Sequence, residues 1–197
     1  SSEQADESAS ATSVYSDSNI SNQFDELMTL LFNILSSKRV QIPSEGVPIY
    51  ASDGTTAVQR SGCCYGISQI LYTKPMSIVQ NIYETVILPQ VLNASVQNTN
   101  IVREGYAQLL LHVAQVFGNK LQPFIDDLFP NVISLLSDPY VHVREYGQQA
   151  AQELVYNFAQ QHTKESSPQT KAIFNTIIVC LQDRDYGVRT GALVIAA

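Results

Sequence analysis

Hydrophobic positions along this chain follow a helical period from residue 24 to the end. In FDELMTLLFNILSSKR (24–39), apolar side chains recur at steps of three and four residues, which is typical of an amphipathic helix. Similar spacing recurs in seven later segments: 55–72, 77–96, 101–120, 121–138, 141–161, 171–185 and 186–197. No segment alternates with period two for long enough to form a strand. The pattern therefore predicts an all-α protein.

Three of these segments show which residues form the expected apolar or small faces. The faces are Phe24, Leu27, Met28, Leu31 and Leu35 in the first segment, Val58, Gly62, Tyr65, Gly66, Ile70 and Leu71 in the second, and Ile78, Ile82, Val86 and Leu88 in the third. Between the helices, the Pro- and Gly-containing stretch 39–54 predicts a long loop, and the polar stretch 162–170 predicts another. Gly118 and Asn119 predict a helix end.

The first residues have a different composition. Residues 1–20 contain seven serines and four acidic residues but no basic residue. Such a sequence buries too little apolar surface to offset the entropy of ordering it. We therefore expect residues 1–21 to be a disordered Ser-rich, acidic linker.

Four arginines repeat at a nearly constant interval. Arg60, Arg103, Arg144 and Arg189 lie 43, 41 and 45 residues apart, each near the start of the second helix of a pair, and each has a glycine two or three residues later. Two helices in about 40–47 residues is the period of HEAT and armadillo repeats. Armadillo units have three helices and a kink signature that this sequence lacks, so the spacing favours a HEAT-repeat α-solenoid, a superhelical stack of antiparallel helix pairs.

The period divides the chain into four predicted repeats. They cover 22–75, with the long loop 39–54 between its helices, then 76–118, 119–164 and a truncated repeat at 165–197. Because one helix pair cannot bury its apolar faces alone, neighbouring pairs are expected to share a continuous core. The chain ends in the apolar run ALVIAA, so we expect it to be a piece of a longer array.

The arginines raise an electrostatic question. The backbone dipole makes the start of a helix positive, so a cation is disfavoured there. We therefore predict that Arg103, Arg144 and Arg189 pair with acidic residues in the turns between helices. Candidate acids are Asp138, Asp183 and Asp185. The alternative, that the arginines contact a partner, stays open, as it does for Arg60.

Composition excludes several functions. The net charge of −7 and the pI near 4.8 argue against direct gripping of nucleic acid. The three cysteines, Cys63, Cys64 and Cys180, form neither a disulfide framework nor a zinc spacing, which favours buried thiols in a reducing, cytoplasmic setting. No apolar run is long enough to span a membrane, so no membrane contact is expected.

No catalytic motif accompanies the helical pattern. The sequence lacks the glycine-rich phosphate-binding motifs and the G-x-S-x-G nucleophile motif. His112, His142 and His162 fall in different predicted repeats, and His112 is expected to pack in its helix. We therefore expect no enzyme activity, no catalytic residue, no metal, no cofactor and no small-molecule substrate.

An ordered series of motifs resembles a known family. VQRSGCCYG, ILPQV, VREGYAQLLLHVAQVFGNKLQPFI and LFPNVISLLSDPYVHVREYGQQAAQELV are similar to the very long HEAT-repeat translational activator that works with the general amino-acid-control kinase. The matching positions are Arg60, Ser61, Gly62, Gly66, Val102, Arg103, Gly105, Tyr106, Phe117, Gly118, Lys120, Pro130, Val143, Arg144 and Ala151. The similarity is good over 58–158, thinner over 24–36 and 173–197, and absent over 1–20 and the loops, including the departures at 39–54 and 162–170.

The resemblance implies a function. It implies a non-catalytic cytoplasmic scaffold, matching the C-terminal part of that family, which binds stalled ribosomes under amino-acid starvation. It also implies recruitment of a protein kinase through the kinase's small RWD domain, so that nucleic acid is contacted only through the ribosome. The kinase phosphorylates the initiation factor that delivers initiator tRNA. The alternative is a nuclear transport receptor or another HEAT-repeat adaptor, because an acidic surface suits basic cargo.

Overall fold

The computed structural model describes residues 23–37, 57–92, 99–161 and 168–197, and within these ranges the chain is helical with no strand. The prediction of an all-α solenoid is confirmed. The predicted linker at 1–21, the loop 39–54 and His162 lie outside the described residues.

Helices follow one another in antiparallel pairs. A first helix covers residues 23–35. After it come α2 (Ala57–Tyr72), a continuous helix made of α3 (Met76–Ile82), η2 (Tyr83–Ile87) and α4 (Leu88–Leu92), and α5 (Asn100–Phe117). The chain continues with η3 (Gly118–Phe124), α6 (Ile125–Ser134), η4 (Leu135–Ser137), α7 (Val141–Gln161), α8 (Pro168–Leu181) and α9 (Tyr186–Ala196). The four repeat boundaries remain a prediction.

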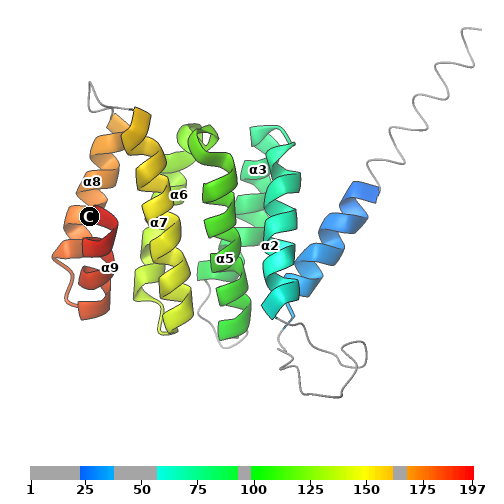
Figure 1. Ribbon diagram of the computed structural model, residues 1–197, viewed down its shortest axis with the longest axis horizontal. Helices are drawn as coiled ribbons and strands as arrows, with labels where there is room; N and C mark the ends of the chain where they lie inside the picture. The colour runs from blue at the N-terminus through cyan, green and yellow to red at the C-terminus, as the bar shows by residue number, and fades with distance from the viewer. Residues whose placement is uncertain (1–22, 38–56, 93–98, 162–167) are drawn as a thin grey trace, which may run out of the picture.

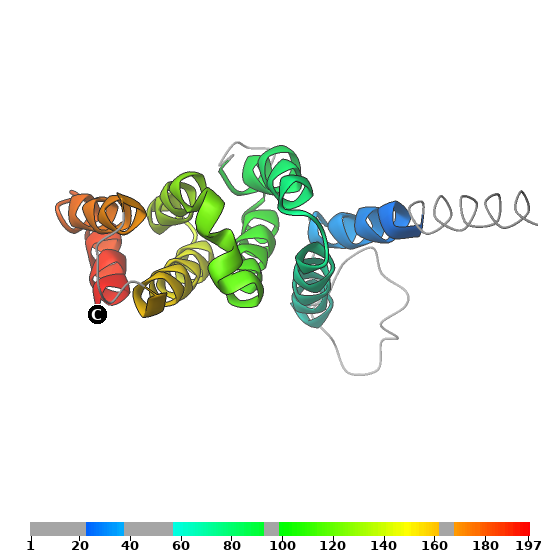
Figure 2. The ribbon, with the colours of Figure 1, turned by 90° about the horizontal axis from the view of Figure 1, so that it is seen from above.

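The pairs stack in a row to form two layers (Figure 1). In one layer α2 packs against α5, α5 against α7, and α7 against α9. The other layer contains α3, α6 and α8, as the view from above shows (Figure 2). Because α5 contacts both α4 and α7, and α7 contacts both α6 and α9, the apolar faces merge into a single core.

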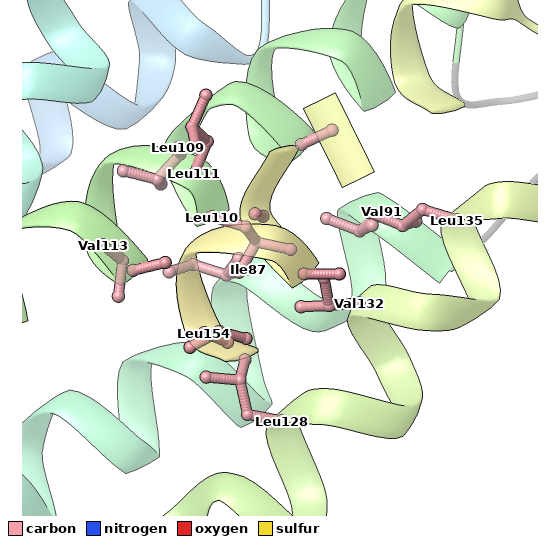
Figure 3. Packing of buried hydrophobic residues seen from close by; sticks show 14 of the residues in the cluster. Ile87, Val91, Leu109, Leu110, Leu111, Val113, Leu128, Val132, Leu135 and Leu154 are labelled. Carbon is pink, nitrogen blue, oxygen red and sulfur yellow. The ribbon is translucent and has the colours of Figure 1, made fainter. Parts of the chain in front are cut away.

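The centre of the core lies where α5 meets its neighbours. Figure 3 shows Ile87, Leu110, Val132 and Leu154 in this region, contributed by η2, α5, α6 and α7. All four side chains are at least nine-tenths buried. At roughly 1.5–3 kcal/mol for each fully buried large aliphatic side chain, this region is a main source of the fold's stability.

The expected apolar faces of the earlier helices were partly wrong. In α2, Val58 and Tyr65 are 81% and 57% exposed, whereas the buried apolar residues are Cys63, Cys64, Ile67 and Leu71. In the third predicted helix the buried set is Val79, Tyr83, Ile87 and Val91, and in the first helix Leu27 is exposed. These helices carry apolar residues on several faces, so their spacing alone does not show which face the neighbouring repeats cover.

Proline positions explain two irregular helices. A π-helical turn, Tyr83–Ile87, lies immediately before Leu88 and Pro89, and the Leu88 N–H bonds to the Tyr83 carbonyl. Since proline cannot donate to the carbonyl four residues earlier, the wider turn accommodates it without ending the helix. Pro130 lies within α6, as the sequence predicted.

Gly118 lies at a helix end and Pro168 at a helix start, positions where glycine and proline are favoured. Gly118 ends α5 with φ of 50°, a left-handed conformation that glycine adopts without steric cost, so the predicted stop is confirmed. The predicted loop 162–170 was too long, because α8 already begins at Pro168. Proline is favoured at the first position of a helix, where its missing N–H has no partner to lose.

Candidate interaction surface

The N-terminal ends of α2, α5 and α7 lie side by side and carry the predicted arginines. Arg60, in the first turn of α2, is only 5% exposed. Its Nη1 donates to the Ser37 carbonyl at 3.1 Å, and its Nη2 donates to the Ile101 carbonyl of the next repeat. Burial lowers the pKa of Arg60, and the nearby Cys64 and Glu104 raise it in part. Arg60 therefore connects two repeats inside the core.

Arg103 connects α5 to the turn before α7. Its Nε donates to Asp138 Oδ2 at 2.8 Å and its Nη2 to Asp138 Oδ1 at 3.2 Å, a bidentate pair. The two side chains are 4% and 6% exposed. Arg103 also donates to Asn100 Oδ1 at 3.0 Å. The predicted pairing of Arg103 with Asp138 is therefore present, and it bridges neighbouring repeats.

The prediction that Arg144 and Arg189 pair with carboxylates was wrong, because both donate to backbone carbonyls. Arg144 Nη1 donates to the backbone carbonyl of Asp138 at 2.7 Å, not to its carboxylate. Arg189 Nη1 donates to the carbonyls of Asp183 and Arg184 at 2.7 and 2.8 Å. Both arginines bind the turn just before their own helix.

These carbonyl contacts explain why a cation lies at a helix start. Asp138 is the C-cap of η4, so its carbonyl belongs to the negative end of the preceding helical segment. A guanidinium placed there is favoured by that segment's dipole, which offsets the positive start of α7. The remaining predicted residue, Asp185, caps α9, because its Oδ1 accepts the Val188 N–H at 3.1 Å.

A groove of about 650 Å³ opens across the same helix ends. It is lined by Ala57, Val58, Arg60, Ser61, Ile101, Glu104, Gly105, Gln108, Tyr140, His142 and Tyr146. These residues come from α2, α5, the turn before α7, and α7 itself, so three predicted repeats contribute. A groove that crosses repeats is a typical partner-binding feature of solenoids. We take it as the candidate interaction surface.

Two tyrosines and a carboxylate form the polar part of the groove. Burial raises the pKa of Tyr140, as do the charge of Glu104 and a hydrogen bond to it. Burial, and then the charge of Glu104, also raise the pKa of Tyr146. Gln108 Nε2 donates to Ser61 Oγ at 3.2 Å and so joins α5 to α2. Glu104 is therefore the carboxylate around which the two phenols are arranged.

Sequence reasoning missed this part of the groove. The available signal was helical spacing, which places four lining residues on one face of α5: Ile101, Glu104, Gly105 and Gln108. Tyr140 approaches that face from the turn before α7 and Tyr146 approaches it from α7, 36 and 42 residues after Glu104. No local pattern places them there.

Two histidines and two cysteines of the described residues pack against, or lie beside, other side chains of the fold. His112 is half-buried, with its ring 6.3 Å from Tyr65 in an edge-on arrangement, and burial lowers its pKa. The expectation that His112 packs in its helix therefore agrees with the structure. His142 is exposed and lies 3.0 Å from Glu145. Cys63 and Cys64 are buried, and burial raises the pKa of Cys64 to about 12.

Within the described ranges, no group of three or more His, Cys, Asp or Glu residues is placed to hold a metal ion. In the same part of the chain, no helix is both long and apolar enough to cross a membrane.

The second half of the chain resembles a known protein family. The model of a family described as the Vacuolar 14 Fab1-binding region matches residues 102–196, which extend from α5 to α9. Comparisons with the curated proteins and with the solved structures found no match. The chain is thus an all-α solenoid, and just under half of it is similar to a region named for binding another protein.

Proposed function

We propose that this chain belongs to a non-catalytic scaffold that holds a kinase. The observation that carries the proposal is the similarity of residues 102–196 to a Fab1-binding region, because Fab1 is a lipid kinase. The stacked architecture supports it, since a solenoid offers an extended surface rather than an enclosed active site. The groove of about 650 Å³ is open and is lined by residues of three predicted repeats.

We further propose that the kinase is the general amino-acid-control protein kinase, bound through its RWD domain on ribosomes in the cytoplasm. The ordered motifs between residues 58 and 158 support this choice. Several motif residues have distinct structural roles: Gly105 faces the guanidinium of Arg60, Arg103 binds Asp138, and Gly118 ends α5. The motif series therefore corresponds to a particular geometry of stacking and is more specific than helical spacing alone.

A second candidate is a scaffold for a Fab1-type lipid kinase. The family similarity favours it and covers α5 to α9. Both candidates share a kinase partner and differ in its class. They also differ in the cellular site, because only the first requires ribosomes.

A binding experiment separates the two candidates. The 197-residue chain is immobilised, and three purified proteins are passed over it by biolayer interferometry: the RWD domain of the amino-acid-control kinase, Fab1, and an unrelated RWD domain as control. Selective binding of the first protein supports the translational scaffold, and this is the expected result. Binding of Fab1 alone would favour the second candidate.

Ribosome association provides an independent readout. The chain is sedimented with purified ribosomes through a sucrose cushion, with and without a mild salt wash. Co-sedimentation that survives the wash supports the translational proposal. Failure to bind either kinase, with a chain shown to be helical by circular dichroism, would refute the proposed kinase scaffold altogether.

A further inference from the structure

The groove across α2, α5 and α7 has a distinctive set of charges. Among the lining residues, Glu104 on α5 supplies a carboxylate, and because the residue is only half-buried, part of it is accessible. At the rim, exposed Glu145 lies beside His142. The groove's surface charge is therefore negative, in keeping with the chain's net charge of −7.

The cation in the groove lies beneath this surface. Arg60 is the one lysine or arginine among the described lining residues, and it is 5% exposed. Its guanidinium donates to carbonyls of Ser37 and Ile101, so it is directed into the protein rather than toward an incoming ligand. Burial lowers the pKa of Arg60, and the charge of Glu104 offsets part of that effect, although Glu104 itself is only half-buried.

Aromatic rings border the carboxylate. Tyr140 and Tyr146 are both half-buried, and each has its pKa raised in part by the charge of Glu104. Val58, which is 81% exposed, supplies an apolar surface on the α2 side. A carboxylate beside aromatic and aliphatic surface suits a long side chain that has an apolar stem and a cationic end.

The same combination of cation and ring already occurs inside this protein. Lys120 Nζ lies 3.5 Å from the ring centroid of Tyr72 on α2, and Lys74 Nζ lies 3.5 Å from that of Phe24. In both cases a lysine ammonium lies over the face of an aromatic ring. The groove tyrosines offer a similar surface together with a carboxylate.

We propose that this groove binds an extended segment of a partner protein through a lysine or arginine side chain, with the cation at Glu104 and the stem against Tyr140 and Tyr146. The partner segment is basic, and its neighbouring residues lie along the N-terminal ends of α2 and α7. This inference goes beyond the proposed function, because it specifies a recognition chemistry that does not depend on which kinase the scaffold holds.

Peptide binding tests the inference directly. The 197-residue chain is titrated into a fluorescein-labelled peptide, Gly-Ser-Leu-Lys-Leu-Ser-Gly, and fluorescence anisotropy is recorded. Matched peptides carry arginine, glutamine or glutamate in place of the lysine. We expect the lysine and arginine peptides to bind about fivefold or more tightly than the glutamine peptide, with the glutamate peptide weakest. Raising the salt concentration should narrow these differences.

Two variants and a control locate the site. Glu104→Gln preserves the shape of the side chain and should abolish the preference, so that the lysine and glutamine peptides bind with an affinity ratio of about one. Tyr146→Leu should weaken the lysine peptide while leaving a preference that depends on Glu104. The control is Glu84→Gln, which removes an exposed carboxylate on η2, outside the groove, and should leave binding unchanged. Circular dichroism establishes that each variant is helical.

Each contrary result would overturn the proposal. Equal binding of the lysine and glutamine peptides would show that the groove does not select a cationic side chain. Tighter binding of the glutamate peptide would assign the groove to an anion held by Arg60. Loss of lysine binding in Glu84→Gln, but not in Glu104→Gln, would place the site elsewhere. Failure of the kinase experiment would leave all of these results unaffected, so the two proposals are tested separately.

Discussion

Gly147 allows α7 to approach the end of the preceding helix. A Cβ atom at this position would lie 2.5 Å from Leu135 Cβ and 3.2 Å from Leu135 Cδ1. Leu135 belongs to η4, is 2% exposed and packs in the core. Because its Cβ is fixed to the backbone, a rotamer change cannot remove the closest contact. Gly147→Ala must therefore move η4 away from α7.

The expected cost follows from two opposing effects. Overpacking a well-packed core costs about 1–3 kcal/mol, and the immobile contact places this site near the upper value. Replacing a glycine inside a helix by alanine stabilises the helix by about 1 kcal/mol. The net loss is therefore about 2 kcal/mol of unfolding free energy. For a chain of this length that corresponds to a decrease of about 4–8 °C in melting temperature.

Gly62 provides a matched control on α2. A Cβ added there meets no heavy atom within 4 Å, so Gly62→Ala should gain only the helix preference of about 1 kcal/mol. Melting followed by circular dichroism at 222 nm should therefore show Gly147→Ala below the unmodified chain and Gly62→Ala above it. A Gly147→Ala protein that melts at or above the unmodified chain would refute the close-approach argument.

Three further predictions concern charges and thiols. Asp138→Ala leaves the buried Arg103 without its carboxylate and should cost about 3–5 kcal/mol in urea unfolding, whereas the double variant with Arg103→Met should recover part of the loss. A single-variant loss below about 1 kcal/mol would contradict this. Burial lowers the pKa of His112, so below about pH 6.5 the unfolded state gains a proton that the folded state resists, and stability falls as the pH falls. In His112→Gln the unfolding free energy should fall less steeply as the pH decreases below about 6.5. An unchanged pH dependence would contradict this prediction. Burial raises the pKa of Cys64 to about 12, so a disulfide reagent at pH 8 should label Cys180 first and Cys64 only after unfolding. Rapid native labelling of Cys64 would disprove its burial.

Local features of this fold were predictable from the sequence. The stop at Gly118 depends on one residue's backbone freedom, and the helical segments depend on spacing within a few turns. The arginine period was also visible, because each repeat preserves the residue that binds the turn or the neighbouring repeat. These signals act over short distances or recur identically, so a single sequence reveals them.

Contacts between repeats were harder to predict. Arg144 was expected to bind a carboxylate, but the Asp138 carboxylate is already bound by Arg103, so Arg144 uses the carbonyl of the same residue. The choice between these oxygens depends on how far α5 lies from the turn, which no sequence spacing gives. The buried face of α2 depends in the same way on α5, which packs against it.

The same inter-repeat contacts determine how rigid the groove is. Gly105 leaves room for the guanidinium of Arg60, which joins the first repeat to α5 through the Ile101 carbonyl. Arg103 then fixes the Asp138 turn, and that turn positions Tyr140, whose N–H also bonds to Asp138 Oδ1 at 2.8 Å. Glu104 lies between these two arginine contacts.

The buried arginines therefore act on binding without touching a ligand. They fix the spacing of the three helix ends before a partner arrives, so the partner does not bear the entropic cost of ordering them. A variant that loosens the Arg103–Asp138 pair should weaken binding of a lysine peptide even though neither residue lines the groove. Such coupling would connect the repeat period seen in the sequence with the recognition surface seen only in the fold.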